Sequence, residues 1–145
     1  ISTGTVINAD TTAELLKNMF FNKAPLHDGA VIIRDGRIAA AGCVLPLTQR
    51  TNLSKDLGMR HRAGIGLSEE SDAVIIVVSE ETGAISVAMD GMLKRHLSGE
   101  ALDKLLRSEL TREDDSTEKH SFMDNIRNFF KVNANVDEKQ DEENL

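Results

Sequence analysis

A histidine, an aspartate and a glycine stand in a row directly before a strongly apolar run. In the stretch PLHDGAVII (residues 25–33), His27, Asp28 and Gly29 precede Ala30 and the aliphatic residues after it. Imidazole and carboxylate groups bind divalent metal ions, and a carboxylate can also polarise a hydroxyl group. Glycine has no Cβ, so a ligand or another backbone segment can approach it closely. Asp and Gly are also common in plain turns before a strand, so the tripeptide alone leaves both interpretations open.

A compact cationic group follows about thirty residues later. The basic residues of the stretch GMRHRAGIG (residues 58–66) are Arg60, His61 and Arg62. Guanidinium groups and the amides at a helix N-terminus both suit phosphate oxygens. The alternative is a solvated surface run whose charges pair with Glu69 or Glu70. The nearby Gly64 and Gly66 indicate a steric requirement at this helix.

Polar residues also follow a second apolar run. In VVSEETGAI (residues 77–85), Ser79, Glu80 and Glu81 come at the end of a predicted strand, where open α/β sheets often bind ligands. A hydroxyl group can contact phosphate, and a glutamate can hold a metal ion. A polar turn that merely joins two strands explains the same residues. The three clusters together supply the groups that a metal–nucleotide site needs.

Apolar periodicity predicts the elements that carry the first cluster. The stripe within residues 11–21 indicates an amphipathic helix, with Asp10, Thr11 or Thr12 as its cap. Residues 30–33 and 38–45 are predicted strands joined by a hairpin turn at Asp35–Gly36, and Pro46 ends the second strand.

The second half of the chain also contains predicted strands and helices. Residues 47–72 are polar and glycine-punctuated, which predicts a loop followed by a short helix. Residues 73–78 form a β-branched run typical of a strand covered on both faces, and residues 81–83 form a turn into a strand over 84–89. Residues 93–110 end in a helix capped by Ser98. We therefore predict an α/β fold with a central mixed β-sheet flanked by helices.

Length and charge limit the classes of protein that fit. The 145 residues, 40% hydrophobic and 28% charged, suit one globular domain, and a net charge of −7 argues against bulk nucleic-acid binding. The single cysteine, Cys43, excludes an internal disulfide and fits a reducing cytosol. No apolar run reaches membrane-spanning length, and no signal peptide is evident. Because the sequence opens with Ile1 rather than Met, we expect an N-terminally truncated fragment whose folded domain covers residues 1–110. We expect residues 111–145, where acidic residues concentrate, to be a charged and disordered tail with a marginal helix around its phenylalanines.

Two long motifs give the sequence a family resemblance. LHDGAVII, RHRAGIGLSEESDAVIIVVSEETGAISVA and the intervening AAAGCVLPLT resemble the bacterial diadenylate cyclase (DAC) domain, nearest to its membrane-anchored, CdaA-type members. The resemblance covers about residues 7–110. It implies a DAC-like fold and a metal-dependent enzyme that condenses two ATP molecules into cyclic di-AMP with release of two pyrophosphates.

The resemblance also implies roles for particular residues. The Asp-Gly-Ala motif falls on Asp28, Gly29 and Ala30, with Asp28 beside the attacking 3′-hydroxyl group and the metal ion. The implied metal ligands are His27, Asp28 and Glu81, and the implied ion is Mg²⁺ or Mn²⁺, in some members Co²⁺. The residues implied to hold substrate are Arg60, His61, Arg62 and Ser79 for the triphosphate and the backbone near Leu45 for adenine. The sequence departs from many members at Met59, where they have threonine, and at Val44, where some have tyrosine.

The resemblance further implies an assembly and a location. Each protomer holds one ATP, so a face-to-face homodimer is required for catalysis, with regulatory proteins as further partners and no nucleic acid. The catalytic domain is expected in the cytoplasm, with the parent protein anchored in the bacterial cell membrane through upstream segments. Two other functions stay open: a regulatory module that binds nucleotide without turnover, and a scaffold whose dimer surface matters more than its pocket.

Overall fold

The computed structural model describes residues 2–111 of the chain, so the predicted tail and its phenylalanine-rich segment lie outside the described residues. The chain divides into two compact units, Ile1–Leu47 and Thr48–Leu145. The described elements are β1 (Thr5–Asp10), α1 (Ala13–Met19), β2 (Ala30–Arg34), β3 (Arg37–Cys43), α2 (Met59–Glu70), β4 (Ile75–Val78), β5 (Ile85–Met89), β6 (Met92–Leu97) and α3 (Gly99–Leu110).

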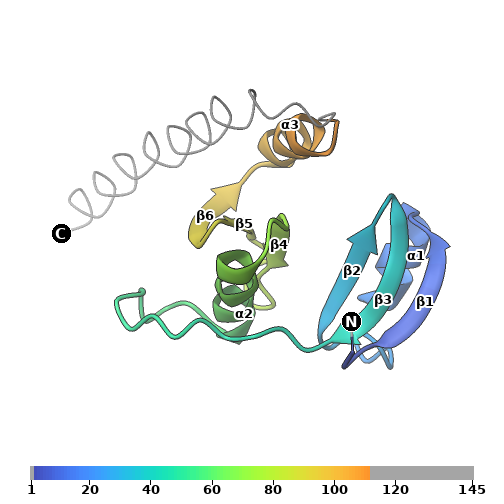
Figure 1. The fold of residues 1–145 in the computed structure, drawn as a ribbon, viewed down its shortest axis with the longest axis horizontal. Helices are drawn as coiled ribbons and strands as arrows, with labels where there is room; N and C mark the ends of the chain where they lie inside the picture. Colours follow the sequence, from blue (N-terminus) through green and yellow to red (C-terminus); the bar gives the residue numbers. More distant parts are fainter. Residues whose placement is uncertain (1, 112–145) are drawn as a thin grey trace. The chain divides into compact units, whose positions relative to one another are not determined.

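The first unit is a small antiparallel sheet with one helix (Figure 1). The strands lie in the order β1-β3-β2, and the fully buried Ile38 and Ala41 of β3 pack with Met19 of α1. The Thr12 hydroxyl oxygen caps α1 by accepting the Leu15 N–H at 3.1 Å, so Thr12 is the cap among the three candidates that the sequence offered.

The β2–β3 hairpin has the predicted two-residue turn. Asp35 and Gly36 have φ values of 52° and 72°, the left-handed geometry that suits the twist of the flanking strands. Ala30 pairs with Cys43 at the open end of this hairpin, and Cys43 is only 1% exposed. Cys43 is therefore a core residue of the first unit.

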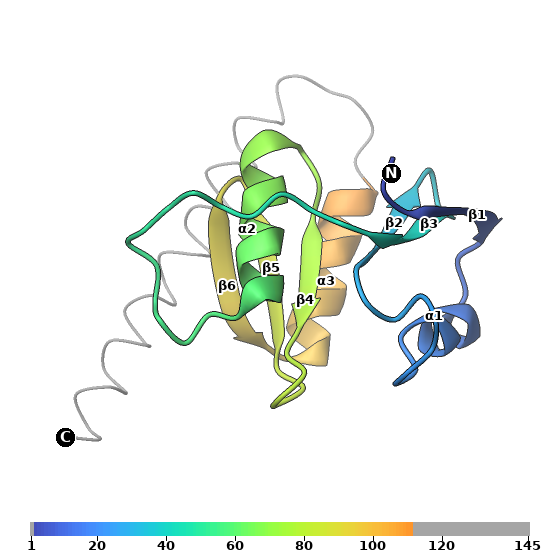
Figure 2. The same cartoon turned by 90° about the horizontal axis from the view of Figure 1, so that it is seen from below.

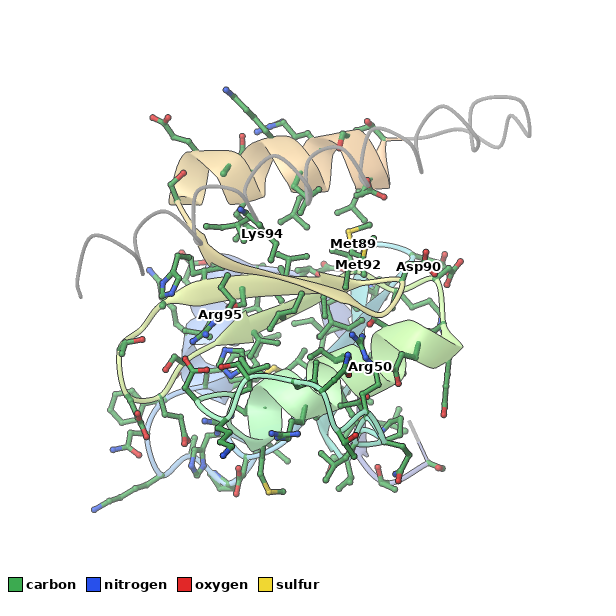
Figure 3. The ribbon with its side chains drawn as sticks, turned by 90° about the vertical axis from the view of Figure 1, so that its left-hand side faces the viewer. Arg50, Met89, Asp90, Met92, Lys94 and Arg95 are labelled. Carbon is green, nitrogen blue, oxygen red and sulfur yellow. The ribbon has the colours of Figure 1, made fainter. Side chains whose placement is uncertain are left out.

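The second unit has a sheet between two helices. Its strands lie in the order β4-β5-β6, with α2 on one face and α3 on the other (Figures 2 and 3). On the α2 side, Ile65 packs with Leu57 and Ala88. On the α3 side, Leu105 packs with Val87 and Leu97. The predicted Ser98 cap is confirmed, since its hydroxyl oxygen accepts the Ala101 N–H at 3.1 Å.

Gly64 explains how closely α2 packs on this sheet. A Cβ at this position would lie 2.8 Å from Val77 Cγ2 and 3.3 Å from Ile75 Cγ2. Since valine and isoleucine side chains have few rotamers, the strand leaves no room for a larger residue. The steric requirement inferred from the glycines beside the basic cluster is confirmed for Gly64.

The α/β class is confirmed, and four details differ from the sequence-based expectations. The described strands form two antiparallel sheets where one mixed sheet was expected. The returning strand β3 ends at Cys43, before Leu45, because the Val44 N–H donates to the Thr3 hydroxyl oxygen at 2.9 Å instead of to a strand. The expected burial of residues 73–78 on both faces is wrong: Ile76 and Val78 are 43% and 52% exposed, because they lie on the face of β4 opposite α2.

Two strands, β1 and β6, were not predicted. The signal for β6 was present: Asp90–Gly91 repeats the Asp35–Gly36 hairpin dipeptide, and both residues have positive φ values. Strand β1 is harder to recognise in the sequence, because a bulge between Val6 and Ala9 interrupts the alternation of side chains between its two faces. None of the described helices is long and apolar enough to cross a membrane.

Candidate functional site

The segment before β2 holds an imidazole in a defined orientation. His27 Nδ1 lies 2.8 Å from the Ala24 carbonyl oxygen, and the His27 N–H donates to the same oxygen at 3.0 Å. Because a carbonyl oxygen only accepts, Nδ1 carries the ring proton, and Nε2 keeps its lone pair. Metal-binding histidines are commonly oriented by such a bond from the other ring nitrogen. His27 therefore fits the predicted role of a metal ligand through Nε2.

Gly29 is required by the close approach of two backbone segments. Its φ value is +103°, and a Cβ there would lie 2.8 Å from the carbonyl carbon of Gly42 and 3.0 Å from the Cys43 carbonyl oxygen. No side chain fits this space, and few L-residues adopt this backbone conformation. The glycine of the Asp-Gly-Ala motif thus lets β2 begin against the end of β3, with Asp28 exposed at the surface.

The hairpin register places the predicted adenine contact at the same end of the first unit. Ala30 pairs with Cys43, so Asp28 and Leu45 each lie two residues beyond the last antiparallel pair. Leu45 is half-buried, whereas the preceding Val44 is 74% exposed. The start of β2 and the segment after β3 therefore lie at the same end of the unit, the open end of the hairpin.

In the second unit, the start of α2 lies beside the turn between β4 and β5. An ion pair joins Arg60 to Glu80, and the Ser79 hydroxyl oxygen accepts the Thr82 N–H at 3.3 Å within that turn. The turn is closed by the Gly83 N–H, which donates to the Ser79 carbonyl oxygen at 2.9 Å. The structure thus brings the predicted phosphate-binding Arg60 and Ser79 to one end of the second unit, and Glu81 is exposed there.

The first turn of α2 is suited to an anion. Gly58 is its N-cap and offers no side-chain hydrogen bond, and the first turn contains no acidic residue. The first amides of a helix lack partners within the helix, and the helix dipole makes this end positive. Arg60 and Arg62 add charge of the same sign, of which the Glu80 carboxylate offsets a part.

His61 differs in burial from its two basic neighbours. It is 9% exposed, while Arg60 and Arg62 are half-buried. Burial lowers the pKa of His61 below its usual value of 6.5, and the charge of Arg95 lowers it further, whereas Asp56 raises it. The neutral ring is therefore favoured in the folded protein.

Sequence reasoning missed an ion pair that lies next to this histidine. Arg95 Nη1 of β6 donates to Asp56 Oδ2 at 2.8 Å, and the Ser54 hydroxyl group donates to the other carboxylate oxygen. These two bonds lower the pKa of Asp56 to about 2. No sequence motif links Asp56 to Arg95, because 39 residues separate them. The suggested pairing of the basic cluster with Glu69 or Glu70 is also replaced by the Arg60–Glu80 pair.

The predicted metal ligands are distributed over the two units. His27 and Asp28 belong to the first unit and Glu81 to the second. Within residues 2–111, no three side chains of His, Cys, Asp or Glu gather where one ion could be held. Imidazole and carboxylate groups nevertheless suit a divalent cation, so the ligand set stays a prediction.

Comparisons with known proteins agree with the resemblance seen in the motifs. The family model for DAC, described as DisA bacterial checkpoint controller nucleotide-binding, matches residues 1–93. Cyclic di-AMP synthase CdaA of Bacillus subtilis is 51% identical over 112 residues, which cover 77% of this chain and 41% of that protein. A diadenylate cyclase of Listeria monocytogenes is 52% identical over 110 residues, which cover 76% of this chain and 40% of that protein. The chain thus spans about two fifths of these relatives.

A solved structure also matches the fold. The crystal structure of a double mutant of DacA from Staphylococcus aureus superposes with a TM-score of 0.74 at 47% sequence identity. The match covers 77% of this chain and 74% of the DacA chain. The matched family model includes both the Asp-Gly-Ala and the Arg-His-Arg motifs. The chain belongs to the DAC family, the bacterial diadenylate cyclase domain.

Proposed function

We propose that this chain is the catalytic part of a diadenylate cyclase, which condenses two ATP molecules into cyclic di-AMP and releases two pyrophosphates. The observation that carries the proposal is the family match over residues 1–93, which contains both motif-bearing segments. Relatives that are about half identical are named diadenylate cyclase or cyclic di-AMP synthase. The local geometry adds an exposed carboxylate at the start of β2 and an anion-suited end of α2.

The proposed reaction consists of two equivalent substitutions. The 3′-oxygen of each ATP attacks the α-phosphorus of the other ATP, forming one P–O bond as the bond to the β-phosphate oxygen breaks. Pyrophosphate leaves with the bonding electrons, and the proton of the 3′-hydroxyl group passes to solvent water. Asp28 is proposed to polarise this hydroxyl group. Catalysis then depends on positioning and charge stabilisation, without a covalent enzyme intermediate.

The basic cluster and the neighbouring turn are proposed to hold the triphosphate. Arg60 and Arg62 supply guanidinium groups, Ser79 supplies a hydroxyl group, and His61 belongs to the same motif. The exposed Glu80 side chain pairs with Arg60 and has to share that guanidinium group when phosphate binds. The backbone near Leu45 is the proposed contact for the adenine edge.

A divalent cation, Mg²⁺ or Mn²⁺ and in some members Co²⁺, is proposed as the cofactor. It would neutralise phosphate charge and acidify the 3′-hydroxyl group. His27, through Nε2, with Asp28 and Glu81, are the proposed ligands. The contact between Nδ1 and the Ala24 carbonyl oxygen supports this assignment, because it orients the ring and leaves Nε2 as the acceptor nitrogen of the neutral tautomer.

The proposed assembly is a face-to-face homodimer, with one ATP per protomer. One protomer alone holds only half of the reactants and should be inactive. The proposed location is the cytoplasmic side of the bacterial cell membrane, with the anchor in upstream segments. A solved neighbour, 52% identical and with a TM-score of 0.64, is named a hypothetical membrane spanning protein from Bacillus cereus. Regulatory proteins are further proposed partners.

The test is product formation by the purified chain. It is incubated with ATP and Mn²⁺ or Mg²⁺, and cyclic di-AMP and pyrophosphate are measured by mass-resolved chromatography. Asp28→Asn should abolish turnover and leave much of the ATP affinity. The matched control is Asp35→Asn in the same unit, because asparagine also tolerates the left-handed conformation of this turn residue.

The other two functions give different results in this experiment. A regulatory module would bind ATP in calorimetry without releasing pyrophosphate. A scaffold would bind no nucleotide. Full activity of Asp28→Asn would show that the role proposed for this carboxylate is wrong.

A further inference from the structure

The loop over residues 48–57 belongs to the second unit, and side-chain hydrogen bonds connect both of its ends to the rest of that unit. At its start, the Thr48 N–H donates to the Arg62 carbonyl oxygen at 3.1 Å, and the Thr48 hydroxyl group donates to Glu69 at 2.9 Å. Arg50 Nη1 donates to the Gly91 carbonyl oxygen at 2.6 Å in the β5–β6 turn. At its end, Asp56 is held by Ser54 and Arg95. The loop is therefore anchored both to α2 and to strands across the sheet.

The anchor at Asp56 directly precedes the basic motif. Asp56 lies two residues before Gly58, the N-cap of α2, and the intervening Leu57 is 8% exposed in the core beside Ile65. Gly58 makes no side-chain cap, so the first turn of α2 lacks the hydrogen bond that usually fixes a helix start. The position of this turn consequently depends on the Asp56 anchor and on the packing of Leu57.

Arg95 contacts Asp56 from strand β6. Successive side chains of β6 point to opposite faces of the sheet, and Figure 3 shows Lys94 on the α3 side and Arg95 on the α2 side. The Arg95 side chain is 32% exposed and the Asp56 side chain 60% exposed. Both charges also act on the buried His61, which is the central residue of the Arg-His-Arg motif.

We propose that Asp56 and Arg95 are positioning residues for the Arg-His-Arg motif. Their ion pair fixes the first turn of α2, and so it directs Arg60 and Arg62 toward a bound triphosphate without contacting the nucleotide. The proposal rests on the proposed function for its ligand, ATP. Exposed ion pairs contribute little to global stability, so a purely structural role predicts no selective effect on ATP binding.

The test compares matched losses of two ion pairs in the full chain. Asp56→Asn and Arg95→Met each remove one charge of the positioning pair, and methionine retains much of the apolar stem of Arg95. The controls are Asp103→Asn and Arg107→Met, which remove an exposed pair within α3. We expect each positioning variant to weaken ATP binding about tenfold in calorimetry, with an unchanged melting temperature. The α3 variants should bind ATP like the wild type.

The double variant separates a pair effect from two independent effects. If the two residues act as one unit, Asp56→Asn/Arg95→Met should bind ATP no more weakly than either single variant. Additive losses in the double variant, or unchanged affinity in the single variants, would overturn the proposal.

Hydrogen exchange provides a readout that does not depend on ATP. The amides of the first turn of α2 should exchange faster in the Asp56 and Arg95 variants, and the amides of β5 should not. Uniformly faster exchange with a lowered melting temperature would assign the pair a structural role only and overturn the proposal. If the wild-type chain binds no ATP, the proposed function fails, while faster exchange confined to α2 still supports the positional role of the pair.

Discussion

Single residues of the motifs serve the site in physically different ways. Gly29 has no side chain because the β3 backbone at Gly42 and Cys43 occupies the space that a Cβ would need. His27 has one ring nitrogen occupied by a backbone carbonyl, which leaves the other available. His61 is buried with a lowered pKa, while Arg60 pairs with Glu80 at the surface. Neighbouring residues of one motif therefore have different structural roles, and each role can be tested separately.

Replacement of Gly29 by alanine should strongly destabilise the first unit. Alanine at φ +103° is strained, and its Cβ would lie 2.8 Å from the Gly42 carbonyl carbon. We expect a loss of about 2–4 kcal/mol in the free energy of unfolding, measured by urea denaturation. Gly36→Ala is the matched control: its φ is also positive, but no atom lies within 4 Å of the added Cβ, so it should cost about 1 kcal/mol. Equal losses would contradict the steric explanation.

The lowered pKa of His61 predicts a pH dependence of stability. The folded protein favours the neutral ring, so its contribution is complete above the unfolded pKa of about 6.5 and is lost as pH falls through the folded pKa. The melting temperature of the wild type should therefore fall more steeply below pH 6.5 than that of His61→Asn. His96→Asn, a change at an exposed histidine, should keep the wild-type slope. Parallel profiles for the wild type and His61→Asn would refute this assignment.

The three described helices begin in two opposite ways. α1 and α3 begin with a hydroxyl cap and have an acidic residue in the first turn, both of which offset the positive helix end. α2 begins with Gly58, has no acid in its first turn and carries Arg60 and Arg62. The start of α2 is therefore more electropositive than the starts of α1 and α3, which suits the proposed triphosphate site.

A carboxylate at the start of α2 should stabilise the helix and weaken ATP binding. Gly58 has an extended backbone and open space around its Cβ position, so Gly58→Asp can cap the helix. We expect a gain of a few tenths of a kcal/mol in stability and about tenfold weaker ATP binding, because the new charge repels phosphate. Gly58→Asn adds a similar cap without charge and should retain wild-type affinity in calorimetry. Equal affinities of the two variants would show that phosphate does not bind near this helix end.

At the scale of the whole molecule, the motifs are divided between two units. The first unit carries His27, Asp28 and Gly29, and the second carries the Arg-His-Arg motif and the Ser79–Glu81 turn. The family model spans both units, and the proposed activity uses residues of both. The proposed reaction adds a further requirement, since two ATP molecules are contributed by two protomers.

The requirement for a dimer predicts a concentration dependence. The rate of cyclic di-AMP formation per chain should fall on dilution as dimers dissociate. Excess Asp28→Asn chain should also inhibit the wild type, because a mixed dimer can activate only one of the two attacking hydroxyl groups. Excess Asp35→Asn chain, the matched control, should not inhibit. A rate per chain that is independent of concentration and of added Asp28→Asn would rule out the dimer mechanism.

The sequence by itself determined the local features of this protein. Helix caps at Thr12 and Ser98, the Asp35–Gly36 hairpin and the α/β class follow from neighbouring residues, because caps, turns and periodicity are short-range effects. The family followed from two contiguous motifs. Only the tertiary structure revealed the contact of Gly29 with β3, the burial of His61 and the Asp56–Arg95 pair. These depend on which strands pair and on which face α2 packs, and residues far apart in sequence determine both.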